Sequence, residues 1–175
     1  DFFHINDEFL QLAILNRGMT IIAIDKRQKF VNRVSYHFPQ GILYLFEQAA
    51  AQVMRKPKIK LYFDGELNLR KYQICIGYRA EWDPAPLVAS FANGNATVSG
   101  GSLVDGIIDG LVSACRKFAN EINIESTNIK RNKVKNGLIL VCSVNANDLV
   151  FGGSFKESLE SGVIRSEAKQ ISERI

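Results

Sequence analysis

The amino-acid sequence predicts an α+β domain, and three observations support that class. Segments with the alternating pattern of half-buried strands and segments with helical spacing follow one another in mixed order. Short turn signals such as Asp64-Gly65 interrupt the strand segments, so the sheet is expected to be antiparallel in part. The chain has 175 residues, 46% of them apolar, which suits a single domain with one core.

The first half of the chain contains two short helices and several strands. Asn6 or Asp7 is a suitable helix cap, and Gly18 is a helix stop. Pro39 and Gly41 interrupt the chain before the second helix. The expected elements are a helix over 6–16, a hairpin of strands 19–25 and 29–38, a helix over 42–54, and strands over 59–67, 69–80 and 86–93.

The second half is expected to contain the longest helix and the central strand. Apolar side chains recur on one face of residues 103–120, a helix that Ser102 opens with Asp105 three residues later. The near-continuous apolar run 138–146 is typical of a strand buried on both faces. Residues 161–175 carry a narrow apolar stripe, and this helix is expected to continue in a longer protein. Because the sequence does not begin with Met, the chain is expected to be a fragment.

Composition and residue spacing argue against several classes of protein. No apolar run approaches the ~18 residues that a transmembrane helix needs. Cys75, Cys115 and Cys142 lack the paired spacing of a metal site or disulfide framework, so we interpret them as small core residues. His4 and His37 have no sequence neighbour that would make either a metal ligand or a general base. A metal site and a self-contained enzyme are therefore not expected.

The net charge of +4 is partly concentrated in clusters of basic residues. Such clusters bind phosphate backbones by releasing counterions, but they are also common in solvated loops, and the sequence leaves both interpretations open. The candidate DNA-binding residues are Arg55, Lys56, Lys58, Lys60, Arg116, Lys117, Lys130, Arg131, Lys133 and Lys135.

The sequence contains two glycine-rich loops, one before the predicted long helix and one after the predicted central strand. Residues 99–102 (SGGS) come before the long helix and suit either an anion at the helix N-terminus or a turn with positive φ. Gly152 and Gly153 precede Lys156, whose ammonium group is a mobile charge with three donors. Such a lysine suits a terminal phosphate, and the alternative is an ordinary exposed loop lysine.

Four segments in this order carry a resemblance to a known family. They are EFLQLAILNRGMTIIAIDKR at 8–27, YHFPQGILYLFEQ at 36–48, YRAEWDPAPLVASFANGNATVSGGSLVDGI at 78–107 and VKNGLILVCSVNANDLVFGGSFKESL at 134–159. Together they cover essentially the whole chain. They resemble the transducer, or second, domain of the ATPase component of bacterial type IIA topoisomerases, that is, of the B subunits of DNA gyrase and topoisomerase IV.

The resemblance implies a fold like that of ribosomal protein S5 domain 2. That fold has a mixed sheet, helices packed on one face and a left-handed βαβ crossover, which is an exception to the usual hand. The resemblance also implies that residues 1–175 are a single transducer domain, with 162–175 starting a connecting helix. The longer chain would carry an N-terminal GHKL ATPase domain and a C-terminal TOPRIM domain, and the fragment alone is expected to be inactive.

In the family, the lysine of a Q-T-K motif contacts the γ-phosphate of ATP in the GHKL domain. Lys156 occupies that position, and Ser154 and Phe155 stand where the family has glutamine and threonine. Lys156 is thus the expected catalytic residue, and Lys156 and Ser154 the expected contacts to the cofactor. The resemblance implies ATP with Mg²⁺ in the intact enzyme. It also implies double-stranded DNA and the A subunit of gyrase or topoisomerase IV as partners, a homodimer of the full-length gyrase B or topoisomerase IV B chain, and a cytoplasmic, nucleoid-associated location in bacteria.

Two other interpretations stay open at the level of the sequence. The chain could be a stand-alone nucleic-acid-binding module with the same S5-like fold, using its basic clusters. It could also be the corresponding domain of another GHKL protein, such as a mismatch-repair or chaperone ATPase. The full-length gene would separate them, because only the first interpretation requires both a GHKL domain upstream and an acidic metal-binding domain downstream.

Overall fold

The computed structural model describes the chain except residues 1, 28–31, 53–56, 58–59, 80–84 and 154–155. The helices are α1 (Phe2–Leu15), α2 (Ile42–Ala51), α3 (Ser102–Glu121), α4 (Arg131–Lys135) and α5 (Gly162–Ser172). The strands are β1 (Thr20–Asp25), β2 (Asn32–His37), β3 (Lys60–Leu67), β4 (Arg70–Tyr78), β5 (Leu87–Ala92), β6 (Asn95–Ala96), β7 (Leu138–Asn145), β8 (Phe151–Gly152) and β9 (Ser158–Leu159). None of the helices in the described part is both long and apolar enough to cross a membrane.

A five-stranded mixed sheet lies at the centre of the molecule, in the order β3-β4-β7-β5-β6. β4 pairs antiparallel with β3 and β7, whereas β5 runs parallel to β7 and is connected to it through α3. β7 is buried from Leu138 to Val144, as expected for a central strand. The α+β class and the mixed sheet are confirmed, and the left-handed crossover stays a prediction.

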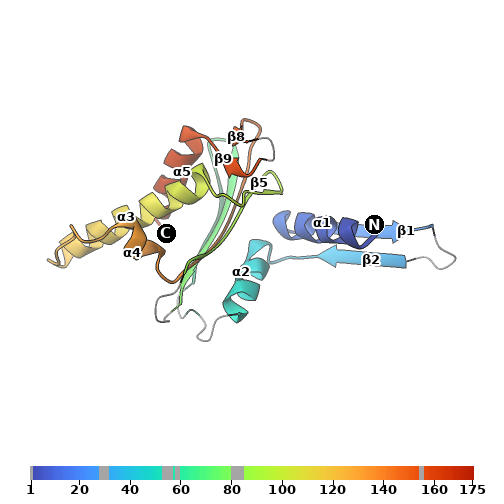
Figure 1. Cartoon of the computed structure of the whole chain (residues 1–175), viewed down its shortest axis with the longest axis horizontal. Coiled ribbons are helices and arrows are strands. Elements are labelled where there is room, and N and C mark those ends of the chain that lie inside the picture. Colours follow the sequence, from blue (N-terminus) through green and yellow to red (C-terminus); the bar gives the residue numbers. More distant parts are fainter. Residues whose placement is uncertain (1, 28–31, 53–56, 58–59, 80–84, 154–155) are drawn as a thin grey trace.

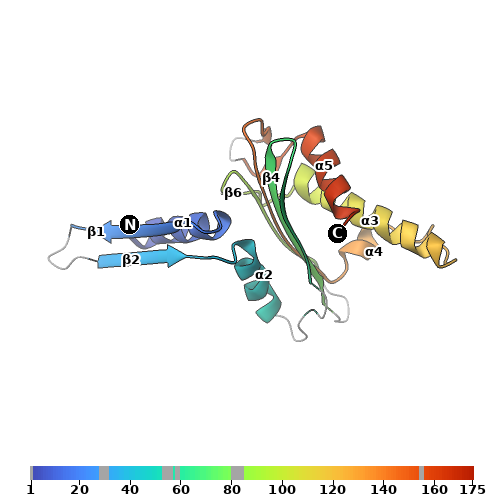
Figure 2. The same ribbon diagram turned by 180° about the vertical axis from the view of Figure 1, so that it is seen from behind.

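Helices cover both faces of this sheet (Figures 1 and 2). On one face, α3 and α5 share an apolar core with alternate strand residues such as Ile74 and Leu140. On the other face, Phe46 of α2 belongs to a second apolar cluster with Cys75 and Val141. The family resemblance implies helices on one face only. The second face also needs cover here because β4 and β7 present apolar side chains on both sides.

The backbones of α3 and α5 lie in direct contact along one side of each helix. A Cβ atom placed on Gly106 would lie 2.3 Å from the carbonyl oxygen of Arg165, and one on Gly110 would lie 2.5 Å from that of Lys169. The two glycines are four residues apart and so share one face of α3. Only glycine fits at these positions, and the absence of side chains lets the two helices pack closely.

α1 and the β1–β2 hairpin form a layer that extends away from the central sheet (Figure 1). The antiparallel pairing of β1 with β2 confirms the predicted hairpin. The α1 helix begins at Phe2, before the predicted cap at Asn6 or Asp7. Several contacts join this layer to the rest. Gln11 Nε2 donates to the carbonyl oxygen of Gly94 at 2.8 Å, Arg17 forms an ion pair with Asp64 at 2.9 Å, and Leu15 packs in the second apolar cluster.

Several local features differ from the sequence prediction. The short elements β6, α4, β8 and β9 were not predicted, because segments of two to five residues carry no periodic signal. The prediction that Ser102 caps α3 is wrong: Gly101 is the N-cap, and the Ser102 hydroxyl accepts a hydrogen bond from the Ser161 N–H instead. Cys115 is exposed rather than in the core, because few residues are buried in the second half of α3.

Candidate functional site

Lys156 lies in the short connection between β8 and β9, which form an antiparallel hairpin. Gly153 and Lys156 both have positive φ, +73° and +56°, a conformation that glycine adopts readily and lysine rarely does. The lysine side chain is exposed, and its Nζ lies 5.4 Å from the ring centroid of Phe151, within cation–π range. The ammonium group is therefore accessible beside the Phe151 ring.

The lysine hairpin, residues 151–159, is docked on the SGGS loop that precedes α3. The Ser99 N–H donates to the Glu157 carbonyl at 2.9 Å, and the Leu159 N–H donates to the Gly100 carbonyl at 3.2 Å. Gly101 has φ of +102°, and a Cβ atom there would lie 2.3 Å from the Leu159 carbonyl oxygen. Of the two interpretations of residues 99–102, the geometry favours the turn, because β9 occupies the space beside these glycines.

The C-terminal end of the hairpin is tied directly to α5. The Glu160 N–H donates to the Val150 carbonyl at 2.8 Å, which closes the base of the hairpin. The Ser161 N–H donates to Ser102 Oγ at 2.7 Å, and the Ser161 hydroxyl in turn caps α5 by accepting from the Ile164 N–H. The hairpin, the start of α3 and the start of α5 therefore form one hydrogen-bonded unit.

A buried polar network supports this unit from the sheet. Glu167 of α5 is 5% exposed and accepts hydrogen bonds from Asn68 Nδ2 at 2.8 Å, Arg70 Nη1 at 2.9 Å and the Tyr72 hydroxyl at 2.5 Å. Arg70 also forms an ion pair with Asp148, in the segment that leads from β7 into the lysine hairpin. The network thus joins β4, α5 and the approach to Lys156.

Burial and hydrogen bonding shift the pKa values of three groups in this network, those of Tyr72 and Arg70 upward and that of Asp148 downward. Burial, together with the hydrogen bond to Glu167, raises the pKa of Tyr72 well above its usual value, so the phenol stays a neutral donor. The hydrogen bond from Arg70 lowers the pKa of Asp148, which stays ionised. The sequence analysis missed this network. The signal that could have found it is the acidic Glu167 directly beside the apolar stripe residue Ala168.

Five of the candidate DNA-binding residues lie on α3 or on the segment that packs along it. They are Arg116 and Lys117 of α3, and Lys130, Lys133 and Lys135 in and beside α4, which packs against α3. Arg116 donates to the Ile129 carbonyl at 3.0 Å, and Lys117, Lys130 and Lys133 are exposed. Of this set, Arg116 and Lys117 lie toward the end of α3 that is remote from the lysine hairpin, whereas Lys135 lies beside Ser99 and Gly100 at the start of the helix.

Two other candidate DNA-binding residues are engaged in ion pairs. Arg131 bridges Asp105 and Asp109 of α3 and so holds α4 on that helix. Lys60, at the start of β3, pairs with Glu47 of α2 at 2.5 Å. Lys60 is therefore held on α2, apart from the basic residues of α3 and α4. The remaining candidates, Arg55, Lys56, Lys58 and Ser154, lie outside the described residues.

Comparison with known proteins identifies the family. The sequence profile described as DNA gyrase B matches residues 41–174. The B subunit of DNA gyrase from Streptococcus pneumoniae is 28% identical over 178 residues, covering 100% of this chain and 26% of that protein. The B subunit of DNA gyrase from Metamycoplasma hominis is 26% identical over 183 residues, covering 98% of this chain and 28% of that protein. The chain spans about a quarter of the length of these relatives.

Solved structures show the same fold over nearly the whole chain. The topoisomerase IV ATP-binding domain of Francisella tularensis, solved with a small-molecule inhibitor, superposes with a TM-score of 0.80 at 18% identity, covering 99% of this chain and 46% of that one. The B subunit of DNA gyrase from Myxococcus xanthus gives a TM-score of 0.74 at 21% identity, covering 99% and 54%. The fold is thus that of a region of the type IIA topoisomerase B subunits. The sequence profile makes the assignment specific: the chain belongs to the DNA gyrase B family.

Proposed function

We propose that this chain is the transducer domain of a gyrase B or topoisomerase IV B protein, the ATPase component of a type IIA topoisomerase. In this role it couples ATP binding and hydrolysis in a neighbouring GHKL domain to the passage of one DNA duplex through another. Membership of the DNA gyrase B family supports the proposal. The observation that carries it is the geometry of Lys156, an exposed ammonium group on a hairpin whose base is hydrogen-bonded to α3 and α5.

The proposed role of Lys156 is to sense the terminal phosphate of ATP and to stabilise the charge that develops during its hydrolysis. Only the nucleotide with its γ-phosphate in place offers this contact. A charge-assisted hydrogen bond present in one state and absent in the other is sufficient to bias a two-state equilibrium by about ten- to a hundredfold. Ser154, in the same loop, is the second proposed contact to this phosphate.

The proposed path of transmission follows the hydrogen bonds described above. A displacement of the lysine hairpin would carry along the SGGS loop and the start of α5, because Ser99, Leu159 and Ser161 bond across these segments. Close packing of Gly106 and Gly110 on α5 would keep the two helices moving together. A contact between Lys156 and the phosphate would thus move α5, the start of the proposed connecting helix.

The other partners follow from the same proposal. ATP with Mg²⁺ would be bound in the intact enzyme, whose gyrase B or topoisomerase IV B chain would form a homodimer and associate with the A subunit in the bacterial cytoplasm, at the nucleoid. The exposed lysines on and beside α3 and α4, Lys117, Lys130 and Lys133, would meet duplex DNA. Residues 1–175 alone would be inactive, because the nucleotide pocket and the DNA-cleaving centres would lie in other domains.

The test is the Lys156→Ala substitution in the full-length protein. ATP turnover and ATP-dependent strand passage are expected to fall sharply, while nucleotide binding changes little because the neighbouring domain supplies most contacts. Lys26→Ala is the matched control. Lys26 is also an exposed lysine, but it follows β1 and lies outside the lysine hairpin. Strand passage at the wild-type rate in the Lys156→Ala enzyme would refute the proposed role.

A further inference from the structure

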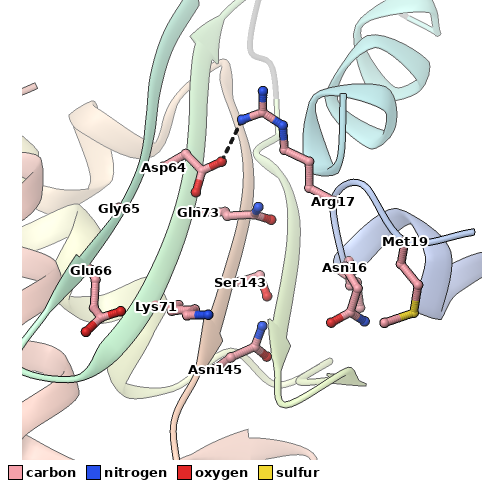
Figure 3. Close-up of a pocket in the computed structure, with 11 residues that line it drawn as sticks. Asn16, Arg17, Met19, Asp64, Gly65, Glu66, Lys71, Gln73, Ser143 and Asn145 are labelled. Atoms are coloured by element: carbon pink, nitrogen blue, oxygen red, sulfur yellow. Dashed lines mark hydrogen bonds and ion pairs between the residues drawn. The ribbon is translucent and has the colours of Figure 1, made fainter. Parts of the chain in front are cut away.

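One end of the central sheet carries a polar cavity that the proposed function does not use. The strand face that meets α2 is apolar at Cys75 and Val141. Two and four residues further along the same face, the side chains become polar, at Gln73 and Lys71 of β4 and at Ser143 and Asn145 of β7. The turn that follows α1 lies opposite, and the open cavity between them has a volume of about 540 Å³ (Figure 3).

The floor of the cavity contains two buried polar atoms that lack a hydrogen-bond partner in the described part of the chain. They are Gln73 Oε1 and Ser143 Oγ, on residues that are directly paired between β4 and β7. Ser143 is 2% exposed. An unsatisfied buried polar atom costs free energy, and native proteins rarely leave two side by side. A molecule that enters the cavity and donates hydrogen bonds would satisfy both atoms.

The charges beside the floor define the chemistry of that molecule. Arg17 and Asp64 neutralise each other across the cavity. The Lys71 side chain, by contrast, has no ion pair or hydrogen bond to any described residue, although Glu66 stands opposite it on β3. The side chain of Asn145, its partner on β7, has none either. Figure 3 shows Lys71, Gln73 and Asn145 pointing from the sheet toward the turn that holds Asn16 and Met19.

These side chains form two cross-strand rows. The first row, Gln73 and Ser143, offers acceptor oxygens, and the second row, Lys71 and Asn145, offers N–H donors. Positions two residues apart on a strand lie about 7 Å from each other along it. A small molecule with an ammonium and a carboxylate group close together matches this spacing when a hydrogen bond of about 2.8 Å is added at each end.

We propose that the cavity binds a small zwitterion of the amino-acid class. Its ammonium group donates to Gln73 Oε1 and Ser143 Oγ, and its carboxylate accepts from Lys71 and Asn145. An aliphatic side chain would lie against Met19, whose exposed fraction is 47%. Because the cavity lies between the turn after α1 and the sheet, the bound molecule would hold the N-terminal layer against the sheet. The proposal does not depend on the role of Lys156.

The test is calorimetric titration of the full-length protein with L-leucine as the probe. L-leucinamide lacks the carboxylate and N-acetyl-L-leucine lacks the ammonium group, and each is expected to bind about tenfold or more weakly, because one charged contact is lost. Lys71→Met and Ser143→Ala are expected to weaken L-leucine binding by about five- to a hundredfold, whereas Lys26→Met leaves it unchanged.

A second measurement separates binding from folding. Without L-leucine, Ser143→Ala is expected to melt at or above the wild-type temperature, because it removes an unsatisfied buried hydroxyl. With L-leucine, the wild-type melting temperature should rise and that of Ser143→Ala should rise less. The proposal is overturned if L-leucine does not bind at millimolar concentration, or if Lys71→Met and Ser143→Ala both bind it as the wild type does.

Discussion

Replacing Gly106 by alanine tests the α3–α5 contact on which the proposed transmission depends. In an isolated helix, this change would be favourable by about 1 kcal/mol, because alanine is the better helix former. In the folded protein, the new Cβ atom would lie 2.3 Å from the Arg165 carbonyl oxygen and 2.9 Å from Ala168 Cβ. The first of these is a backbone atom of a packed helix, so the overlap is relieved only by separating α3 from α5.

Because the overlap is with a backbone atom, the cost of overpacking lies at the upper end of its usual range, about 3 kcal/mol, and outweighs the gain of about 1 kcal/mol in helix propensity. We expect a net loss of about 2 kcal/mol, which for a chain of this length lowers the melting temperature by about 4–8 °C in a circular dichroism experiment. Gly162→Ala is the control, because no atom lies within 4 Å of its added Cβ, and it should melt at or slightly above the wild-type temperature. A Gly106→Ala protein as stable as the wild type would refute the reasoning.

Three further predictions concern stability, pH and DNA. Tyr72→Phe removes a donor from the buried carboxylate of Glu167, and urea denaturation should show a loss of about 1.5–3 kcal/mol; a loss below about 0.5 kcal/mol would contradict the network. The hydrogen bonds from Arg27 lower the pKa of Asp25 from 3.8 to about 2, so its stabilising contribution is complete above pH 3.8 and is lost as the pH falls through 2. Asp25→Asn should therefore flatten the dependence of stability on pH over that interval, and an unchanged slope would count against it. In the full-length protein, Lys133→Ala should reduce the slope of log K against log salt for duplex DNA by about 0.9, and an unaltered slope would remove this residue from the proposed interface.

Periodic segments were predictable from the sequence, and short or tertiary features were not. The helix predicted over 103–120 and the strand predicted over 138–146 are found at Ser102–Glu121 and Leu138–Asn145. Both segments are long and strongly patterned, so their burial follows from the pattern itself. By contrast, the β8–β9 hairpin depends on contacts with the SGGS loop, which the sequence places about 50 residues away.

The candidate site was predictable residue by residue but not as an assembly. Lys156 was identified from its glycines and from the family resemblance, and its role stays a prediction because its exposure suits a phosphate contact and an ordinary loop lysine alike. The role of Gly101 was not predictable, because a close approach to Leu159 leaves no mark in a single sequence. Arg131 was predicted to be a DNA-binding residue, because its ion pairs could not be foreseen. They are made with Asp105 and Asp109, which lie on another helix.

The most direct test of the central claim is a structure of the full-length protein with a non-hydrolysable ATP analogue. The account predicts that Lys156 Nζ lies within hydrogen-bond distance, about 2.7–3.2 Å, of an oxygen of the γ-phosphate. It also predicts that the ADP complex lacks this contact and shows the lysine hairpin, together with the start of α5, in a different position. A structure in which Lys156 Nζ points into solvent beside a fully bound triphosphate would contradict the account.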